Sequence, residues 1–141
     1  MLRRRRRREA FTLIEVLLVL VILVILGSLA GVSIRSAQKK GLVNAAKAQV
    51  RGFKTPMDMY QLDVGSYPSS STGLEALRSA PGDVQDSKWQ GPYLESAVPV
   101  DPWGRAYQFA NPGKHNADGY DVWSLGPDGA DGTDDDIGNW D

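Results

Sequence analysis

The chain has 141 residues and a formal net charge of −1, a length that allows one domain and excludes a large two-domain enzyme. It has no cysteine and a single histidine, His115, which excludes a disulfide framework, a thiolate zinc site and a multi-histidine metal centre. The near-neutral charge conceals an asymmetry: residues 3–8 are six arginines, whereas residues 118–141 hold eight acidic residues and no lysine or arginine. Without residues 1–10 the chain carries 10 basic and 16 acidic residues, a net charge of −6.

An apolar segment follows the arginines directly, and residues 16–34 carry no charge. A helix of these 19 residues rises about 28 Å, close to the ~30 Å hydrocarbon core of a bilayer. A buried helix of a soluble domain is the alternative, but so small a domain has few other apolar residues to surround it. We therefore predict a membrane span, with the arginines marking the cytoplasmic side rather than forming a nucleic-acid arm.

Glu15 is a charged residue inside this apolar segment. A carboxylate costs about 2.5–3.5 kcal/mol at the middle of a bilayer and less near its surface. The side chain therefore either extends towards the headgroups or needs a cationic partner. A cleaved secretory signal fits poorly, because the apolar run is long and only Ala30-Gly31-Val32-Ser33 offers a weak cleavage site.

A polar helix with one apolar stripe is predicted next. Its apolar residues recur at spacings of three and four, which is typical of an amphipathic helix facing a core. Pro56 lies within the pattern and is expected to kink the helix or remove one backbone hydrogen bond, and Gly41 and Gly52 weaken it further. The stripe consists of Val43, Ala46, Val50, Phe53, Met57 and Tyr60.

The rest of the chain predicts a small α+β domain. Residues 67–73 are turn formers, residues 73–77 a short helix, and residues 81–102 a mostly irregular connection. Residues 105–110 and 120–125 are the best strand candidates, so two or three short strands would pack on the helix. We expect most of the four tryptophans to be core or semi-core anchors rather than binding platforms, and no catalytic role for His115, which lies in a polar turn.

Five carboxylates lie within nine residues near the C-terminus, at 128, 131, 134, 135 and 136. Calcium takes six to eight oxygen ligands in irregular geometry, and interspersed glycines allow the turns that such a loop needs. The spacing departs from the EF-hand template, because residue 130 is Ala and no glutamate closes a twelve-residue loop. The residues alone leave two interpretations open, a solvated acidic loop and a calcium site.

The N-terminal residues carry a specific resemblance. Their pattern is similar to the signal peptide of type IV pilins and type II secretion pseudopilins. The resemblance implies that a prepilin peptidase cleaves between Ala10 and Phe11 and methylates the new N-terminus. Glu15 would then neutralise the N-terminal amine of a neighbouring subunit during assembly. The family commonly has Gly where this chain has Ala10. The matching residues are Glu9-Ala10-Phe11-Thr12-Leu13-Ile14-Glu15.

Further blocks resemble the type II secretion major pseudopilins, the general secretion pathway protein G family. This resemblance implies a type IV pilin-like α+β fold with a cleaved leader at 1–10, a transmembrane and assembly helix at 11–34 and a periplasmic domain at 35–141. It also implies calcium in the C-terminal loop. The ligands would be the side chains of Asp128, Asp135 and Asp136 and the backbone oxygens of Leu125 and Thr133, with Asp131 and Asp134 facing solvent. The matching blocks are 58–68, 73–77, 101–107, 124–129 and 134–140.

The resemblance implies a structural subunit rather than an enzyme. Its expected role is to polymerise into the pseudopilus that drives folded proteins across the outer membrane, with minor pseudopilins and the inner-membrane secretion platform as partners and no nucleic acid. A type IV pilin-like subunit for adhesion or DNA uptake is the alternative, although the chain lacks cysteines for the disulfide common in pilins. A membrane-anchored, calcium-dependent enzyme or binding module is a third, for which the sequence offers no convergent polar site.

Overall fold

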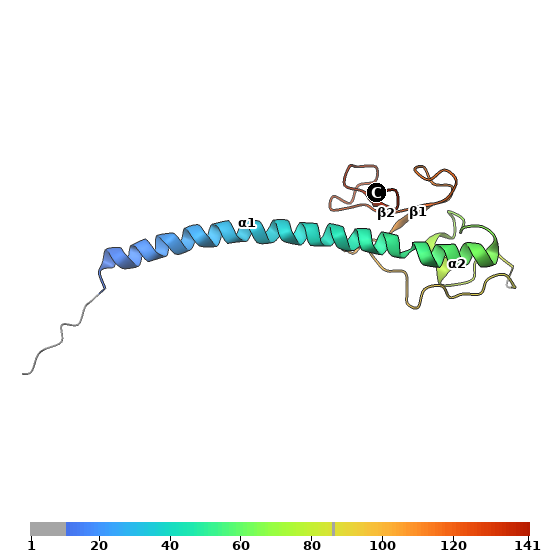
Figure 1. The fold of residues 1–141 in the computed structure, drawn as a ribbon, viewed down its shortest axis with the longest axis horizontal. Helices are drawn as coiled ribbons and strands as arrows, with labels where there is room; N and C mark the ends of the chain where they lie inside the picture. Colours follow the sequence, from blue (N-terminus) through green and yellow to red (C-terminus); the bar gives the residue numbers. More distant parts are fainter. Residues whose placement is uncertain (1–10, 86) are drawn as a thin grey trace, which may run out of the picture. The chain divides into compact units, whose positions relative to one another are not determined.

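The computed structural model describes residues 11–85 and 87–141, without the side chains of residues 29–33. The chain divides into two units that meet in sequence between Lys39 and Lys40. The expected leader, residues 1–10, lies outside the described part. Helix α1, Leu13–Gly52, runs through the first unit and into the second (Figure 1).

The N-terminal part of α1 exposes its apolar side chains. Phe11, just before the helix, is 82% exposed and Leu13 is 80% exposed, and residues 16–26 are exposed throughout. The span expected over residues 16–34 includes the side chains of 29–33, which lie outside the described part. Among the described residues, no helix combines the length and the apolar character that a membrane crossing requires.

The helix is interrupted near Pro56. Helix α1 ends at Gly52 and α2, Lys54–Val64, begins two residues later. Pro56 has no N–H to donate to the carbonyl of Gly52, four residues earlier, so the regular helical bonding stops there. Instead Phe53 N–H bonds the carbonyl of Val50 at 3.3 Å, and regular bonding resumes with Met57 N–H to Phe53 at 3.0 Å. The expected kink is thus a short break upstream of the proline.

The apolar stripe predicted from the sequence forms the helical side of the core. Ala46, Val50, Phe53, Met57 and Tyr60 are buried, which confirms that side of the helix as the packed one. The first member of the stripe, Val43, is half-buried. From the remainder of the unit, the core adds Leu74, Ala76, Leu77, Tyr107, Tyr120 and Val122.

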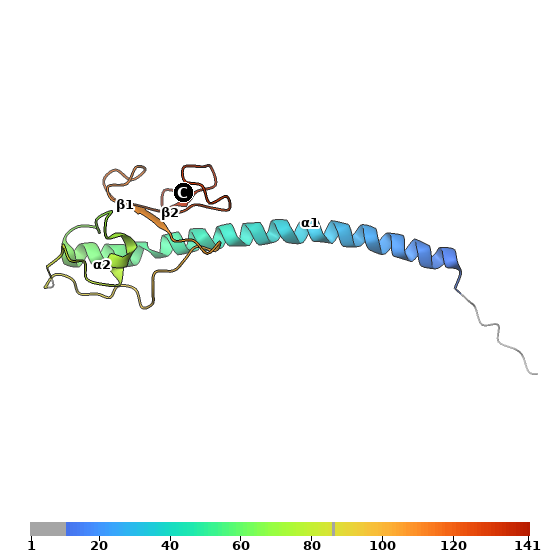
Figure 2. The same ribbon diagram turned by 180° about the vertical axis from the view of Figure 1, so that it is seen from behind.

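A three-stranded antiparallel sheet completes the fold, in the order β1-β2-β3. Within residues 40–141, the strands and the loops after them lie on one side of the helical segment, and much of residues 78–100 runs along the other (Figures 1 and 2). The helix predicted at 73–77 is a 3₁₀ helix, η1. The strands are β1, Gln108–Ala110, β2, Asp121–Ser124, and β3, Ile137–Gly138.

The first two strands are shorter than predicted, and local bonding explains why. The N–H of Arg105 bonds the carboxylate of Asp101 at 2.8 Å and its carbonyl accepts the N–H of Asp101, so this residue closes a turn before β1 begins. The carbonyl of Leu125 accepts the N–H of Gly129, so β2 ends one residue earlier than expected. The resulting fold, a long helix and a small antiparallel sheet, confirms the α+β class.

Candidate functional site

The N-terminal site expected from the sequence lies at the start of α1. Phe11 precedes the helix, Glu15 lies exposed in its first turn, and Ala10 lies outside the described residues. The hydroxyl of Thr12 accepts a hydrogen bond from the N–H of Glu15 at 3.4 Å. This is the Thr half of a Thr-x-x-Glu capping box. Glu15 thus also belongs to the helix start, a role that the Thr-x-x-Glu spacing signals but that is not among the expectations above.

The acidic loop between β2 and β3 turns at glycines in the left-handed region. Gly126 has a φ of 62° and Gly129 a φ of 72°. A β-carbon at Gly126 would overlap the carbonyl of Asp135, which crosses the start of the loop. The two ends of the loop therefore approach each other closely, and the sequence allows that approach because the residue there is glycine.

The predicted ligands in this loop are bound mainly to one another. The backbone N–H of Asp128 donates to Asp135 Oδ2 at 3.2 Å, and the hydroxyl of Thr133 donates to Asp135 Oδ1 at 2.9 Å. The hydrogen bond from Thr133 is the main reason that the pKa of Asp135 lies below its ordinary value. The carbonyls of Leu125 and Thr133 each accept a backbone N–H, from Gly129 and Asp136. The structure thus joins Asp128, Thr133 and Asp135 in one network.

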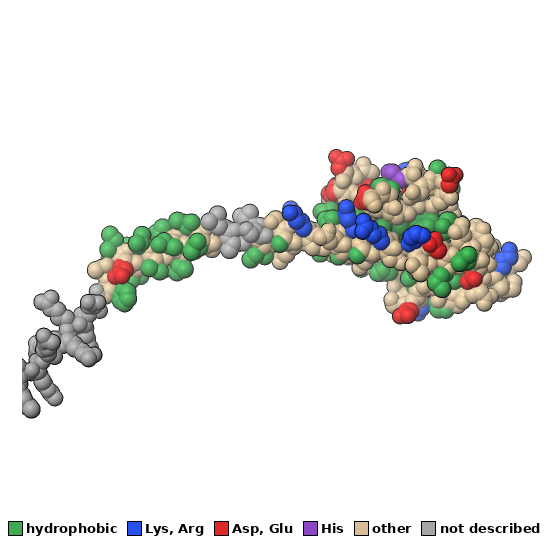
Figure 3. Space-filling view, in the orientation of Figure 1, with side chains coloured by type: hydrophobic (Ala, Val, Ile, Leu, Met, Phe, Trp, Pro, Cys, Tyr) green, Lys and Arg blue, Asp and Glu red, His purple; other side chains and the backbone are tan. Residues whose placement is uncertain are grey.

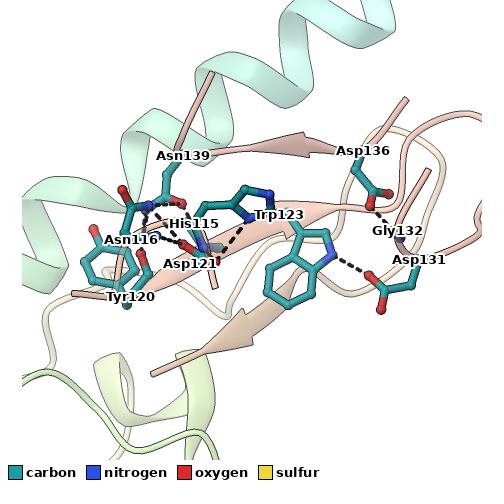
Figure 4. Close-up of polar contacts among 10 residues, drawn as sticks. His115, Asn116, Tyr120, Asp121, Trp123, Asp131, Gly132, Asp136 and Asn139 are labelled. Carbon is teal, nitrogen blue, oxygen red and sulfur yellow. Dashed lines mark hydrogen bonds and ion pairs between the residues drawn. The ribbon is translucent and has the colours of Figure 1, made fainter. Parts of the chain in front are cut away.

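Asp136 is the ligand candidate with unused capacity. Its Oδ2 accepts the N–H of Gly132 at 2.7 Å, whereas its Oδ1 is buried and has no hydrogen-bond partner (Figure 4). A buried carboxylate oxygen without a partner is unfavourable unless a cation or water satisfies it. The atoms of the loop that could bind a metal ion are all oxygens, which are the ligands that a hard cation such as calcium prefers. In residues 11–85 and 87–141, however, no three His, Cys, Asp or Glu side chains are gathered closely enough to hold a metal.

Arg105 ties the acidic loop to the turn before β1. Its Nη2 donates to the carbonyl of Gly126, and its Nε lies 3.7 Å from a carboxylate oxygen of Asp101. Asp101 is 2% exposed and also accepts the hydroxyl of Ser124 at 2.7 Å. A β-carbon at Gly129 would overlap the guanidinium of Arg105. This half-buried connection fixes the start of the loop, and the sequence alone does not indicate it for any of its members.

A second buried carboxylate organises the turn between β1 and β2. Asp121 accepts the backbone N–H groups of His115 and Asn116, at 2.8 and 3.0 Å, and the side-chain amide of Asn116 at 2.9 Å (Figure 4). Burial raises the pKa of Asp121, but these hydrogen bonds outweigh it, and the pKa lies below its ordinary value. The His115 ring stacks on Trp140 with centroids 3.8 Å apart. His115 therefore serves packing at the end of the chain.

The two residues expected to face solvent are exposed, with one qualification. Asp131 and Asp134 both lie on the surface of the loop. Asp131 Oδ1 also accepts the indole N–H of Trp123 at 3.0 Å (Figure 4). None of the four tryptophans is fully buried; Trp89 packs against the core and donates its indole N–H to the carbonyl of Ala76 at 2.9 Å.

Comparison with known families accounts for nearly the whole sequence. The family "Type II secretion system (T2SS), protein G" matches residues 33–140. The "Prokaryotic N-terminal methylation motif" matches residues 5–31, the region that contains Phe11 and Glu15.

Individual relatives support the same family. The type II secretion system core protein G of Pseudomonas aeruginosa is 42% identical over 97% of this chain and 98% of the relative. The core protein G of Escherichia coli K12 is 37% identical over 95% of this chain and 92% of the relative. The crystal structure of the major pseudopilin from the type 2 secretion system of enterohaemorrhagic Escherichia coli superposes with a TM-score of 0.64. It is 38% identical and covers 74% of this chain and 87% of that one.

Proposed function

The chain belongs to the type II secretion system protein G family, and we propose from that membership that it polymerises through its N-terminal helix into the pseudopilus. It is a pseudopilin of the type II secretion system, similar over its full length to core protein G. Growth of the filament would drive folded proteins across the outer membrane. Minor pseudopilins and the inner-membrane secretion platform would be its partners.

The exposed apolar face of α1 is the observation that carries this proposal. Its apolar side chains between residues 11 and 26 are exposed in the part of the chain that the structure describes, and each large one gains about 1.5–3 kcal/mol when it is buried. Packing against copies of itself would bury them all at once. A helix apolar on all sides is typical of a membrane span or of the interior of an assembly.

Before assembly, the same segment would hold the subunit in the inner membrane. We place residues 1–10 in the cytoplasm, because the six arginines follow the positive-inside pattern, and residues 35–141 in the periplasm. A prepilin peptidase would cleave between Ala10 and Phe11 and methylate Phe11. Mass spectrometry of the chain purified from membranes tests this step, with a methylated Phe11 as the expected N-terminus. An N-terminus at Met1 or beyond Ala30 would contradict it.

Glu15 would then guide assembly by pairing with the N-terminal amine of the next subunit. Removing one partner of a buried charge pair costs about 3–5 kcal/mol, because the other charge remains uncompensated. We expect Glu15→Gln to insert into the membrane normally but to form few filaments, measured by shearing and quantifying polymer. Glu75→Gln, at an exposed acid outside α1, is the matched control. Wild-type filament yield from Glu15→Gln would contradict the role of Glu15.

Calcium is the ion we propose for the acidic loop. Asp128, Asp135 and Asp136 would supply carboxylates, and Leu125 and Thr133 backbone oxygens. The buried, unpartnered Oδ1 of Asp136 supports a cation there. Bound calcium would neutralise the crowded carboxylates and hold β2 and β3 together, as a disulfide would in a chain with cysteines. Residues of this loop now bonded to each other would have to exchange some of those bonds for the ion.

The calcium proposal is tested by unfolding the chain in detergent with chelator and with calcium. Free calcium at 100 times its dissociation constant would stabilise the folded state by about 2.7 kcal/mol. We expect Asp136→Asn to lose most of that gain, and Glu95→Gln, at an exposed acid outside the loop, to keep it. Identical unfolding curves with and without calcium would show that the acidic loop works without the ion.

A further inference from the structure

The basic residues that remain after the leader are concentrated on one helical stretch. Residues 35–54 hold six of the ten, and no acidic residue. Residues 118–141 have the opposite composition, with eight acids and no lysine or arginine. Figure 3 shows Lys and Arg side chains gathered along the end of α1 and the start of α2. Charges of opposite sign are thus separated onto two surfaces of one chain.

Three of these basic residues, Lys40, Lys47 and Arg51, form one line along α1, which we name the basic stripe. They are seven and four residues apart, two turns and one turn of helix, so they share a face. That face is about a quarter turn from the buried residues Ala46 and Val50. Lys40 and Arg51 are exposed and Lys47 is half-buried, so the stripe borders the packed side of the helix without entering it.

Within the described residues, Lys40 and Lys47 form no ion pair. Across residues 11–85 and 87–141, ion pairs join Lys54 to Asp58, Arg105 to Asp101 and His115 to Asp121, and none includes the stripe. Arg51 lines a cavity of about 740 Å³ together with Asp118 and Asp141, so one end of the stripe already faces acids of its own chain. Lys40 and Lys47 do not line that cavity.

We propose that the basic stripe is a docking surface for the acidic loop, residues 128–136, of a second copy of this chain. The proposal rests on the polymerisation proposed above and specifies one contact within it. Lys40 and Lys47 are about 10 Å apart along the helix axis, and Asp131 and Asp134 lie three residues apart in the turns of the acidic loop. These two acids are exposed and lie outside the predicted calcium ligands, so they retain their charge when the ion is bound.

Charge complementarity favours a second copy over an anionic lipid surface. The acidic loop occurs once in every subunit, in the same number as the stripe, so a polymer can pair them repeatedly. Exposed ion pairs are individually worth about 0.2–1 kcal/mol, but a filament repeats them at each subunit. Their contribution is screened by salt, with a Debye length of about 8 Å at physiological ionic strength. A lipid surface would engage the stripe alone and would supply no cation for Asp131 and Asp134, which lie outside the predicted calcium ligands.

Charge exchange tests the proposal on the full chain expressed with its secretion system. We expect the Lys40→Glu/Lys47→Glu double variant to lower filament yield about tenfold, the effect of two lost ion pairs and the new repulsion. Adding Asp131→Lys/Asp134→Lys to the same chain should restore most of it. Lys88→Glu, an exposed lysine outside the stripe, is the matched control and should assemble normally. Failure of the added lysines to restore assembly would overturn the proposal.

Because the chain has no cysteine, introduced thiols give a second, direct readout. Lys47→Cys and Asp134→Cys variants, co-expressed and treated with a short bismaleimide, should crosslink to each other but not each to itself. Binding of the charge-reversed chain to anionic vesicles is measured in parallel. If the charge-reversed chain no longer binds vesicles and the two cysteine variants form no crosslink, the stripe binds lipid and the proposed interface is wrong. Absence of filaments from the unsubstituted chain would contradict the proposed function itself, and the interface with it.

Discussion

Residues 11–39 and residues 40–141 follow opposite rules of burial. In the first region the apolar side chains that the structure describes are exposed, as at Leu20, which is 52% exposed. In the second they converge on a core, as at Phe53, which is 2% exposed. The first region therefore depends on surroundings outside the subunit, whereas the second is stabilised by its own side chains. Substitutions should separate the two regions by whether assembly or folding fails.

Phe53→Ala should give the largest effect. The side chain is buried and meets Tyr107 edge-to-face with centroids 5.3 Å apart, so its removal leaves a cavity in the core. We expect the free energy of unfolding to fall by about 3–5 kcal/mol. Leu20→Ala is the comparison from the exposed region. It should leave unfolding of the domain in detergent unchanged while lowering filament yield. Equal destabilisation by both substitutions would contradict the separation of the two regions.

Asp121→Asn should have an intermediate effect, because it tests a polar rather than an apolar anchor of the second region. The neutral amide loses the charge-assisted bonds from His115 and Asn116, each worth about 1.5–3 kcal/mol, and one oxygen becomes a donor. We expect a net loss of about 2 kcal/mol at neutral pH in urea unfolding. Asp83→Asn, at an exposed acid, is the control.

The same variant has a distinct pH signature. The pKa of Asp121 is lower in the folded state than in the unfolded state, so its ionisation stabilises the fold above the unfolded value of about 3.9. That contribution is lost as the pH falls through the folded pKa. The acid limb of the stability curve should therefore be shallower in Asp121→Asn than in the wild type. Parallel acid limbs would assign the loss to packing.

Gly52→Ala should have the smallest effect and the opposite sign. A β-carbon at this position meets no atom within 4 Å, and the backbone is helical. Alanine lowers the entropy of the unfolded chain, so we expect a gain of about 0.5–1 kcal/mol in urea unfolding. Gly126→Ala is the contrasting variant, because its left-handed φ and its contact with Asp135 make alanine destabilising.

The parts of the fold that depend on local periodicity could be predicted from the sequence. The apolar stripe from Ala46 to Tyr60 needs only helical spacing, and it is buried as expected. The ends of the strands could be predicted less well, because they are set by single side chains. Asp101, for example, accepts the N–H of Arg105, and β1 is therefore shorter than predicted. The two-residue strand β3 has no alternating pattern to identify it.

The candidate sites also differ in how far they could be predicted from the sequence. The acidic loop is visible as a cluster of carboxylates, and its glycines indicate tight turns. The role of Arg105 is not visible, because its partner in the acidic loop comes from a separate turn and only the fold brings the two together. Arg105 reaches Gly126, 21 residues along the chain.

The break between α1 and α2 has a mechanical consequence. A continuous helix transmits tension along its axis partly through successive backbone hydrogen bonds. Pro56 has no N–H, so the hydrogen bond to the carbonyl of Gly52 is missing here. At the break the hydrogen bonds from Phe53 N–H to Val50 and from Met57 N–H to Phe53 remain, and the side chains of Val50, Phe53 and Met57, which are all buried in the core, support them. The junction therefore depends on the packing around it more than an uninterrupted helix would, so we expect a pulling force to disturb the core of the second region first.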